Sequence, residues 1–135
     1  MTPTLTAFAG FASWALFLLV VMEVLRSKLV LAKVVPANGF TPDNGNLSPF
    51  MQRLARAHAN CLEGLPIFGG LMLVAVVAGR STITDPLAYV FLGARVTQSV
   101  IHLCSVSATA VTLRFTAFLL QTGIGVYWAI RLLSA

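Results

Sequence analysis

Polar side chains recur at a helical spacing in the segment QRLARAHANCLEGLP. Arg53, Arg56, Asn60 and Glu63 are separated by three, four and three residues. At about 100° per residue, an α-helix places all four side chains within an arc of roughly 80°. This pattern predicts one polar stripe, able to form one side of a binding site for a charged ligand.

A second stripe with the same spacing follows later in the chain. It consists of Arg95, Gln98, His102 and Ser105, on an otherwise apolar segment. If the two segments cross a membrane in opposite directions, the stripes overlap in depth and face one site. Arg114, at the expected start of the next helix, is placed to complete a cationic pocket.

The charges of this constellation do not balance. Arg56, Arg95 and Arg114 stand against a single carboxylate, that of Glu63. Ionisable groups at membrane depth are expensive unless paired or wet, so the excess of positive charge indicates an anionic ligand. A structural alternative stays open, in which Arg56, Glu63 and Arg95 form a buried ion-pair network and Asn60 and Gln98 supply hydrogen bonds between helices.

The composition places these stripes in a membrane. The 135 residues are 58% hydrophobic and 10% charged, with a mean hydropathy of +0.88. Soluble domains average about 25% charged residues, so a soluble globule and a disordered chain are both excluded. The net charge of +5 therefore concerns the membrane, and no nucleic-acid partner is expected. Cys61 and Cys104 lack the spacing of metal ligands, and no metal site is predicted.

The apolar stretches predict an all-α, four-helix integral membrane bundle in a single domain covering residues 1–135. A bilayer core of about 30 Å needs about 20 helical residues, and four stretches qualify, at about 5–26, 50–79, 86–106 and 114–133. The polar, Pro- and Gly-rich segment from about 27 to 49 is a loop. Ser48-Pro49 and Asp85-Pro86 are expected to begin the second and third helices.

Basic residues near the span ends predict the orientation. Five lie on one side, namely Arg26, Lys28, Lys33, Arg53 and Arg114, and two on the other, Arg80 and Arg131. The positive-inside rule then makes the loop cytoplasmic and puts both termini on the non-cytoplasmic side. A bacterial inner membrane is the expected location, and Glu23 is expected to pair locally with Arg26.

The stretch RLARAHANCLEGLPIF resembles the signature of the membrane-associated proteins in eicosanoid and glutathione metabolism. The pattern Arg-Ala-x-x-Asn-x-x-Glu-x-x-Pro is matched by Arg56, Ala57, Asn60, Glu63 and Pro66. GARVTQSVIH adds weaker support. The resemblance implies four-helix protomers in a homotrimer, with glutathione bound as co-substrate between neighbouring protomers.

The resemblance also implies roles for individual residues. Arg114 would be the catalytic residue, holding the glutathione sulfur as thiolate. The glutathione contacts would be Arg56, Asn60, Glu63, Arg95, Gln98, His102 and Lys33. Glu63 would take the ammonium group, and Lys33 a carboxylate.

Three functions remain in view at this point. The first is a glutathione-dependent transferase or peroxidase acting on a lipophilic electrophile that enters from the bilayer. The second is a non-catalytic, lipid-binding scaffold of the same fold, favoured by the unusual Gly64, Gln98 and His102. The third is a small multidrug exporter, in which Glu23 would be the proton-coupled carboxylate.

Overall fold

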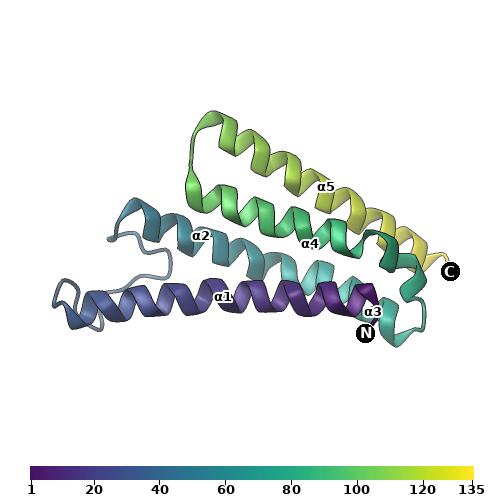
Figure 1. The fold of residues 1–135 in the computed structure, drawn as a ribbon, viewed down its shortest axis with the longest axis horizontal. Coiled ribbons are helices and arrows are strands. Elements are labelled where there is room, and N and C mark those ends of the chain that lie inside the picture. The colour runs from purple at the N-terminus through teal and green to yellow at the C-terminus, as the bar shows by residue number, and fades with distance from the viewer.

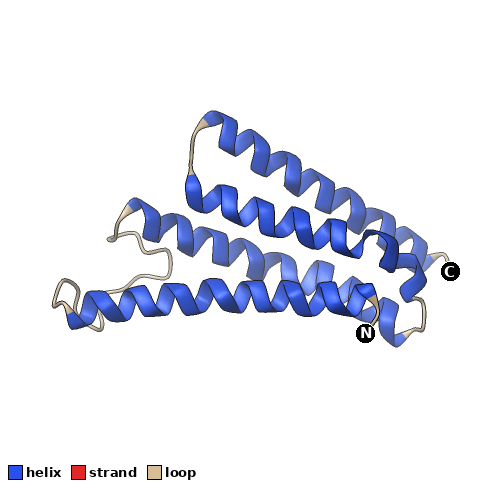
Figure 2. Ribbon diagram, viewed as in Figure 1, coloured by secondary structure: helices blue, strands red, loops and turns tan.

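The computed structural model describes residues 1–135 as helices joined by short connections, without β-strands (Figures 1 and 2). In chain order these are α1 (Pro3–Leu31), α2 (Pro49–Gly64), the π-helical turn η1 (Leu65–Gly69), α3 (Gly70–Val77), α4 (Ser81–Cys104) and α5 (Ala108–Leu133). Because α2, η1 and α3 form one continuous rod, four helices are long and apolar enough to cross a membrane. The predicted all-α, four-span architecture is confirmed.

The helices run alternately up and down. Both termini and the α3–α4 connection lie at one end of the bundle, and the loop 32–48 and the α4–α5 turn lie at the other (Figure 1). α1, α2 and α4 pack against one another, whereas α5 packs along α4 and touches α3. This arrangement separates α5 from α2.

Apolar residues at helical spacing form the core. On α1 the buried positions follow one another every three or four residues: Ala7, Phe11, Ala15, Leu18 and Met22. Phe91 of α4 lies at the centre, with ring centroids 5.7 Å from Phe11, 4.9 Å from Phe68 and 5.6 Å from Trp128. One aromatic cluster therefore ties all four spans together.

Helix α4 begins earlier than Asp85-Pro86 predicts. It starts at Ser81, after a turn in which Gly79 has a φ of +66°. Pro86 lies inside the second turn of the helix, where it lacks the N–H for one intrahelical hydrogen bond and its ring crowds the preceding turn. Asp85 instead accepts a hydrogen bond from the backbone N–H of Thr4, at 3.0 Å, and so caps the first turn of α1.

Helix α5 also begins earlier than expected. It starts at Ala108, because the Ser107 side chain accepts a hydrogen bond from the N–H of Ala110 at 3.2 Å and caps the helix. Arg114 is therefore nearly two turns inside α5 rather than at its start. Arg114 is therefore not among the basic residues that flank the spans and predict the orientation. Four such residues remain at the end with the loop 32–48, against two at the opposite end.

The second span contains the π-helical turn η1, which the sequence pattern did not predict. Pro66 lacks the N–H that an α-helix would direct to the carbonyl of Leu62, and its ring would clash there, so the helix widens by one residue. Gly69 lets α1 approach this turn, since a Cβ at Gly69 would lie 2.6 Å from Phe8. The widened turn forms one wall of the site described below.

The loop 32–48 is pinned to the bundle by Arg26. The Nε and Nη2 atoms of Arg26 donate hydrogen bonds of 3.0 and 2.6 Å to Oδ1 of Asn44. Asn44 is fully buried, and its side-chain N–H donates to the carbonyl of Met51 at 2.7 Å. Arg26 also forms the predicted pair with Glu23, at 3.2 Å. The loop is thereby held against the ends of α1 and α2.

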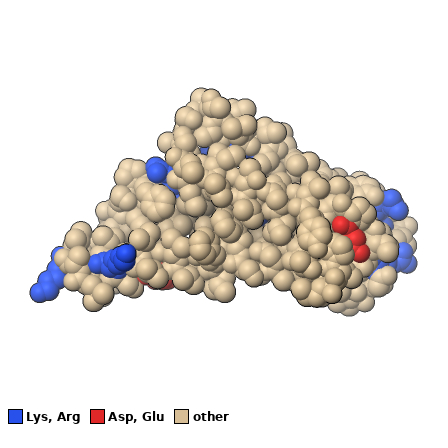
Figure 3. Space-filling view, in the orientation of Figure 1, with Lys and Arg blue, Asp and Glu red and all other residues tan.

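Charged side chains on the surface lie mainly at the two ends of the helix bundle. Most Lys and Arg side chains visible in Figure 3 lie near the two ends of the molecule, and the middle of that face is largely free of charge. Large apolar side chains of every span are exposed there or elsewhere, including Leu16, Leu73, Val90 and Leu119. A surface of this kind is suited to a lipid environment.

Candidate functional site

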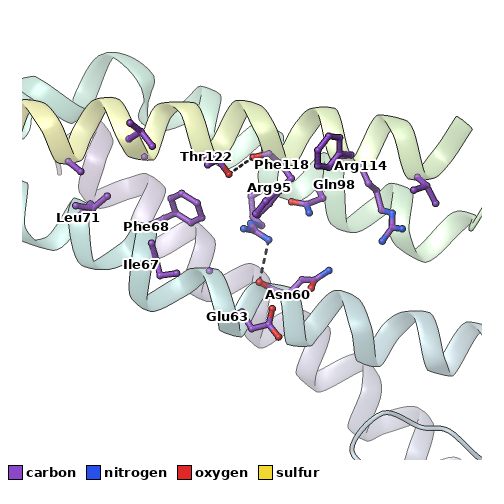
Figure 4. Close-up of a pocket in the computed structure, with 16 residues that line it drawn as sticks. Asn60, Glu63, Ile67, Phe68, Leu71, Arg95, Gln98, Arg114, Phe118 and Thr122 are labelled. Carbon is purple, nitrogen blue, oxygen red and sulfur yellow. Dashed lines mark hydrogen bonds between the residues drawn. The ribbon is translucent and has the colours of Figure 1, made fainter. Parts of the chain in front are cut away.

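A groove runs between α2 and α5, with α4 as its floor. It encloses about 720 Å³ and is lined by 16 residues from α2, η1, α3, α4 and α5 (Figure 4). The groove exists because α5 packs along α4 and leaves α2 uncovered on this side. Its two halves differ in chemistry.

The half nearer the loop 32–48 is polar. It brings together five of the eight residues predicted from the sequence: Asn60, Glu63, Arg95, Gln98 and Arg114. They come from three helices, and Figure 4 shows the side chains of Arg95 and Arg114 directed into the space between them. Half of each predicted stripe, from α2 and from α4, therefore lies together with Arg114 in the groove.

Arg95 is a buried cation without an acidic partner. It is 2% exposed, and its Nη1 donates a long hydrogen bond of 3.4 Å to the backbone carbonyl of Asn60. Its guanidinium lies 5.1 Å from the Phe11 ring centroid, and its Nε has no hydrogen-bond partner. The single ion pair of the structure is Arg26–Glu23, so the alternative of an Arg56–Glu63–Arg95 ion-pair network is wrong.

Gly64 makes room for this guanidinium. A Cβ at position 64 would lie 2.7 Å from Nη2 of Arg95 and 3.5 Å from the Phe11 ring. Any larger residue would push the end of the Arg95 side chain away. The absence of a side chain at position 64 thus places the cation at the groove.

Gln98 pairs with a residue that the sequence analysis did not assign to the site. The side-chain N–H of Gln121 on α5 donates to Oε1 of Gln98 at 2.8 Å, and both residues are buried. Gln98 therefore supplies the interhelical hydrogen bond considered in the structural alternative. Gln121 lies on the same helix face as Arg114, and a buried amide such as that of Gln98 requires a hydrogen-bond partner.

Arg114 contributes the second cation of the groove. Its side chain is half-buried, and its Nε atom is buried without a partner. No carboxylate lies within ion-pair distance of it. Its charge is therefore available to a ligand.

Three predicted residues do not line the groove of a single chain. Arg56 is exposed on α2, His102 is buried on α4 without a hydrogen bond, and Lys33 is exposed with a φ of +58° in the turn after α1. Arg53 has a different role, because its Nε donates to the carbonyl of Leu103 at 3.0 Å. It thus satisfies the C-terminal end of α4, where a cation is favourable.

The other half of the groove carries no charged side chain. Its lining residues are Ile67, Phe68, Leu71, Thr122, Gly125, Val126 and Ala129. The Thr122 hydroxyl donates to the carbonyl of Phe118 at 2.9 Å, which leaves little free polarity. Gly125 lets η1 approach α5, since a Cβ there would lie 2.7 Å from the Phe68 ring.

The donors needed for a protein-bound metal are absent, because no group of three His, Cys, Asp or Glu side chains converges anywhere in the structure. The site therefore consists of a cationic half, a hydrogen-bonded centre and an apolar half. It can bind a charged polar molecule beside a lipophilic one.

Comparison with known proteins gives one finding. Neither the curated proteins nor the solved structures contain a match to the chain. The sequence model of the MAPEG family matches residues 4–134, which include all four membrane-spanning helices. The chain therefore belongs to the MAPEG family of integral membrane proteins, which is associated with glutathione.

Proposed function

We propose that this protein is a membrane-embedded, glutathione-dependent transferase or peroxidase that acts on lipophilic electrophiles. The observation that carries the proposal is a single groove in which two unpaired guanidiniums and one carboxylate adjoin an uncharged apolar half. Glutathione has two carboxylates, one ammonium and a thiol, and its net charge of about −1 near pH 7 complements the local excess of one positive charge. A lipophilic electrophile suits the apolar half.

The residues of the polar half suit separate parts of the tripeptide. Glu63 takes the ammonium group, while Asn60, Gln98 and Arg95, together with Arg56 on α2 outside the groove of the single chain, bind carboxylate and peptide groups. Arg114 faces the sulfur. A free thiol has a pKa of about 8.5 and is mostly protonated near pH 7, so a guanidinium beside it increases the fraction of reactive thiolate.

A homotrimer completes this site. Arg56 and Glu63 are exposed on a membrane-spanning helix of the single chain, and charges facing lipid are unfavourable by several kcal/mol. A neighbouring copy that covers this face removes that penalty. Lys33, which lies outside its own groove, reaches bound glutathione across such an interface.

The site opens to the cytoplasm in this proposal. Arg26, Lys28, Lys33 and Arg53 cluster at the end with the loop 32–48, whereas Arg80 and Arg131 lie at the opposite end. The positive-inside rule then puts both termini on the non-cytoplasmic side. The membrane of this proposal is a bacterial inner membrane. Glutathione enters from the cytoplasm and the electrophile enters from the bilayer.

Calorimetric titration of glutathione into the protein in lipid nanodiscs tests the proposal. We expect binding by the wild type and a loss of affinity of tenfold or more for Glu63→Gln, since a hydrogen bond between charged groups contributes about 1.5–3 kcal/mol. Glu23→Gln is the matched control, because Glu23 is paired with Arg26 outside the groove. Absence of binding by an intact wild-type oligomer would refute the proposal.

A lipid-binding scaffold without catalysis is the second candidate. The Gln98–Gln121 hydrogen bond favours it, because that bond occupies the amide oxygen that a ligand would otherwise use. Retention of a lipophilic probe without glutathione binding would support it. The exporter hypothesis has no comparable observation, since Glu23 pairs with Arg26 and does not line the groove.

A further inference from the structure

A second cavity lies at the end of the bundle that carries the loop 32–48 (Figure 1). It encloses about 930 Å³ between the last turns of α1, the loop and the first turn of α2, and it shares no lining residue with the groove. Cavities of about 300–1,000 Å³ are typical of small-molecule sites. Most of its lining is apolar, namely Leu25, Leu29, Val34, Val35, Pro36, Leu47, Phe50 and Met51.

The cavity continues the core stripe of α1. Ala15, Leu18 and Met22 are buried in the bundle, and Leu25 and Leu29 follow them at the same spacing of three and four residues. Leu25 and Leu29 are only half-buried, because the loop rather than another helix faces them across the cavity. The apolar face of α1 therefore extends beyond the packed core and is suited to the apolar part of a ligand.

Backbone turns and hydrogen bonds hold the loop in place around this cavity. At the end of α1 the N–H of Val34 donates to the carbonyl of Leu29 at 3.0 Å, which turns the chain back across the helix end. The side-chain N–H of Asn46 donates to the carbonyl of Gly39 at 2.8 Å and ties the two arms of the loop together. A Cβ at Gly39 would lie 2.8 Å from Pro36, so glycine is required in this turn. The walls are thus fixed without a ligand.

Polar groups with unused capacity also line the cavity. Lys28 is its single charged residue and forms no ion pair. The Ser48 hydroxyl accepts the N–H of Met51 at 3.3 Å, and its own hydrogen stays available to donate. The side-chain N–H of Asn46 is bound to Gly39, which leaves its Oδ1 atom as an acceptor. No carboxylate lines the cavity, so it offers no partner for the ammonium group of glutathione.

The depth of the cavity fits the headgroup layer of a bilayer. Helix α1 has 29 residues and is about 43 Å long, whereas the hydrocarbon core is about 30 Å thick. The ends of α1 therefore extend into the headgroup layers, and Lys28 lies in its last turn. Val34 and Phe50 of the lining are 67% and 40% exposed, which is unfavourable in water and favourable against acyl chains.

We propose that this cavity binds an anionic phospholipid of the surrounding membrane. The phosphate lies against Lys28 and Ser48, and a hydroxyl of the headgroup donates to Asn46. The first part of an acyl chain lies along Leu25 and Leu29. A fatty acid carboxylate uses fewer of these polar groups, and free phosphate has no part that fits the apolar lining. Lipid binding here is independent of glutathione binding, because the two sites share no residue.

Native mass spectrometry of the delipidated, intact oligomer tests the proposal. The probes are dioleoyl phosphatidylglycerol, dioleoyl phosphatidylcholine, oleate and inorganic phosphate. We expect saturation at one phosphatidylglycerol per protomer, a Kd at least fivefold below that of phosphatidylcholine, and no binding of phosphate. Lys28→Gln should raise the Kd of phosphatidylglycerol about fivefold, since one cation is lost beside an anionic headgroup. The Kd of phosphatidylcholine should change less than twofold, because its choline charge offsets its phosphate.

A matched variant separates the cavity from general surface charge. Adding Ser27→Lys to Lys28→Gln restores the net charge at the same depth, but about 100° around the helix. Ser27 is exposed and does not line the cavity, so the double variant should bind as weakly as Lys28→Gln. Leu29→Trp fills the space of the acyl chain and should weaken both phospholipids tenfold or more, since it displaces several methylene groups. If Leu29→Trp does not fold, Val34→Trp on the loop gives the same comparison.

Four results would overturn the proposal. Recovery of phosphatidylglycerol affinity in the double variant would show attraction by surface charge alone. Equal Kd values for the two phospholipids would exclude recognition of the headgroup by Lys28. Tighter binding of oleate than of phosphatidylglycerol would assign the cavity to a free fatty acid. Saturation below one lipid per protomer would show that a neighbouring copy covers the cavity.

Discussion

Replacing Arg114 with alanine should shift the pH dependence of glutathione consumption. Arg114 is half-buried in the groove, its Nε has no partner, and no carboxylate neutralises its charge. In the proposed function this cation stabilises the thiolate form of bound glutathione. The variant therefore removes charge stabilisation of the nucleophile, and it leaves Glu63 and Asn60 in place.

The size of the effect follows from the ionisation of a thiol. With a pKa of about 8.5, roughly 3% of a thiol is ionised at pH 7. A single opposite charge within about 4–6 Å lowers such a pKa by about one to two units, which corresponds to roughly 25–75% thiolate. Loss of Arg114 should therefore lower kcat at pH 7 by about 8- to 25-fold.

The assay is the pH–rate profile of glutathione consumption at saturating electrophile, with ultraviolet absorbance of the bound thiolate as a second measurement. In the wild type the rate should rise with pH, with a midpoint between about pH 6.5 and 7.5 and a plateau about one pH unit higher. In Arg114→Ala the rise should move upward by one to two pH units, toward the free thiol. Arg114→Lys retains a cation and should lie between the two.

One result would contradict this reasoning directly. A profile of Arg114→Ala that coincides with the wild type, in an oligomer that still binds glutathione, would show that Arg114 does not act on the sulfur. A uniform decrease at all pH values would point to positioning instead. Arg80→Ala, at the opposite end of the bundle, controls for loss of positive charge in general.

Three further predictions concern the scaffold that holds the site. Asn44→Ala should lower the free energy of unfolding by about 2–3 kcal/mol, since it leaves partly buried donors of Arg26 unpaired, and Asn44→Gly should cost less because Asn44 has a φ of +54°. Thermal unfolding in detergent measures both losses, and equal losses would exclude a contribution from the backbone conformation. Phe91→Ala should cost about 3–5 kcal/mol by opening the aromatic cluster, and a loss below 1 kcal/mol in the same measurement would show that the cluster is not a shared core. Hydrogen bonds from the Thr41 side chain and the Gly45 N–H hold the pKa of Asp43 below its usual 3.8, so the stabilisation it gives is complete above about pH 4 and is lost as the pH falls through the lowered pKa. Acid unfolding of Asp43→Asn compared with the wild type checks the last prediction, which fails if their difference in stability does not shrink below pH 4.

The sequence was sufficient for the number of spans and for the polar stripe of α2. Both depend on local properties, namely the length of apolar stretches and the repeat of about 3.6 residues per turn. The convergence of Asn60, Glu63, Arg95, Gln98 and Arg114 also followed, because alternate helix directions bring the stripes to the same depth.

The sequence was insufficient where the outcome depends on what faces a residue. Periodicity gives the helix face of Arg95, but whether it meets a carboxylate or an empty space at Gly64 depends on packing. The start of α5 depended on a choice among closely spaced capping residues, and Ser107 is the one that caps. A helix start is the most favourable position for a proline, yet Pro86 lies in the second turn of α4, at the cost of one hydrogen bond and of crowding against the preceding turn.

The attachment of α5 to one side of the bundle has an evolutionary consequence. The polar half of the groove depends mainly on α2 and α4, which also form the packed core, whereas most of the apolar lining comes from α5. Substitutions at Thr122, Val126 or Ala129 can change the size and shape of the acceptor chamber while the core and the cationic half stay intact. The range of accepted lipophilic molecules can therefore diverge among descendants of this chain faster than the recognition of the polar co-substrate.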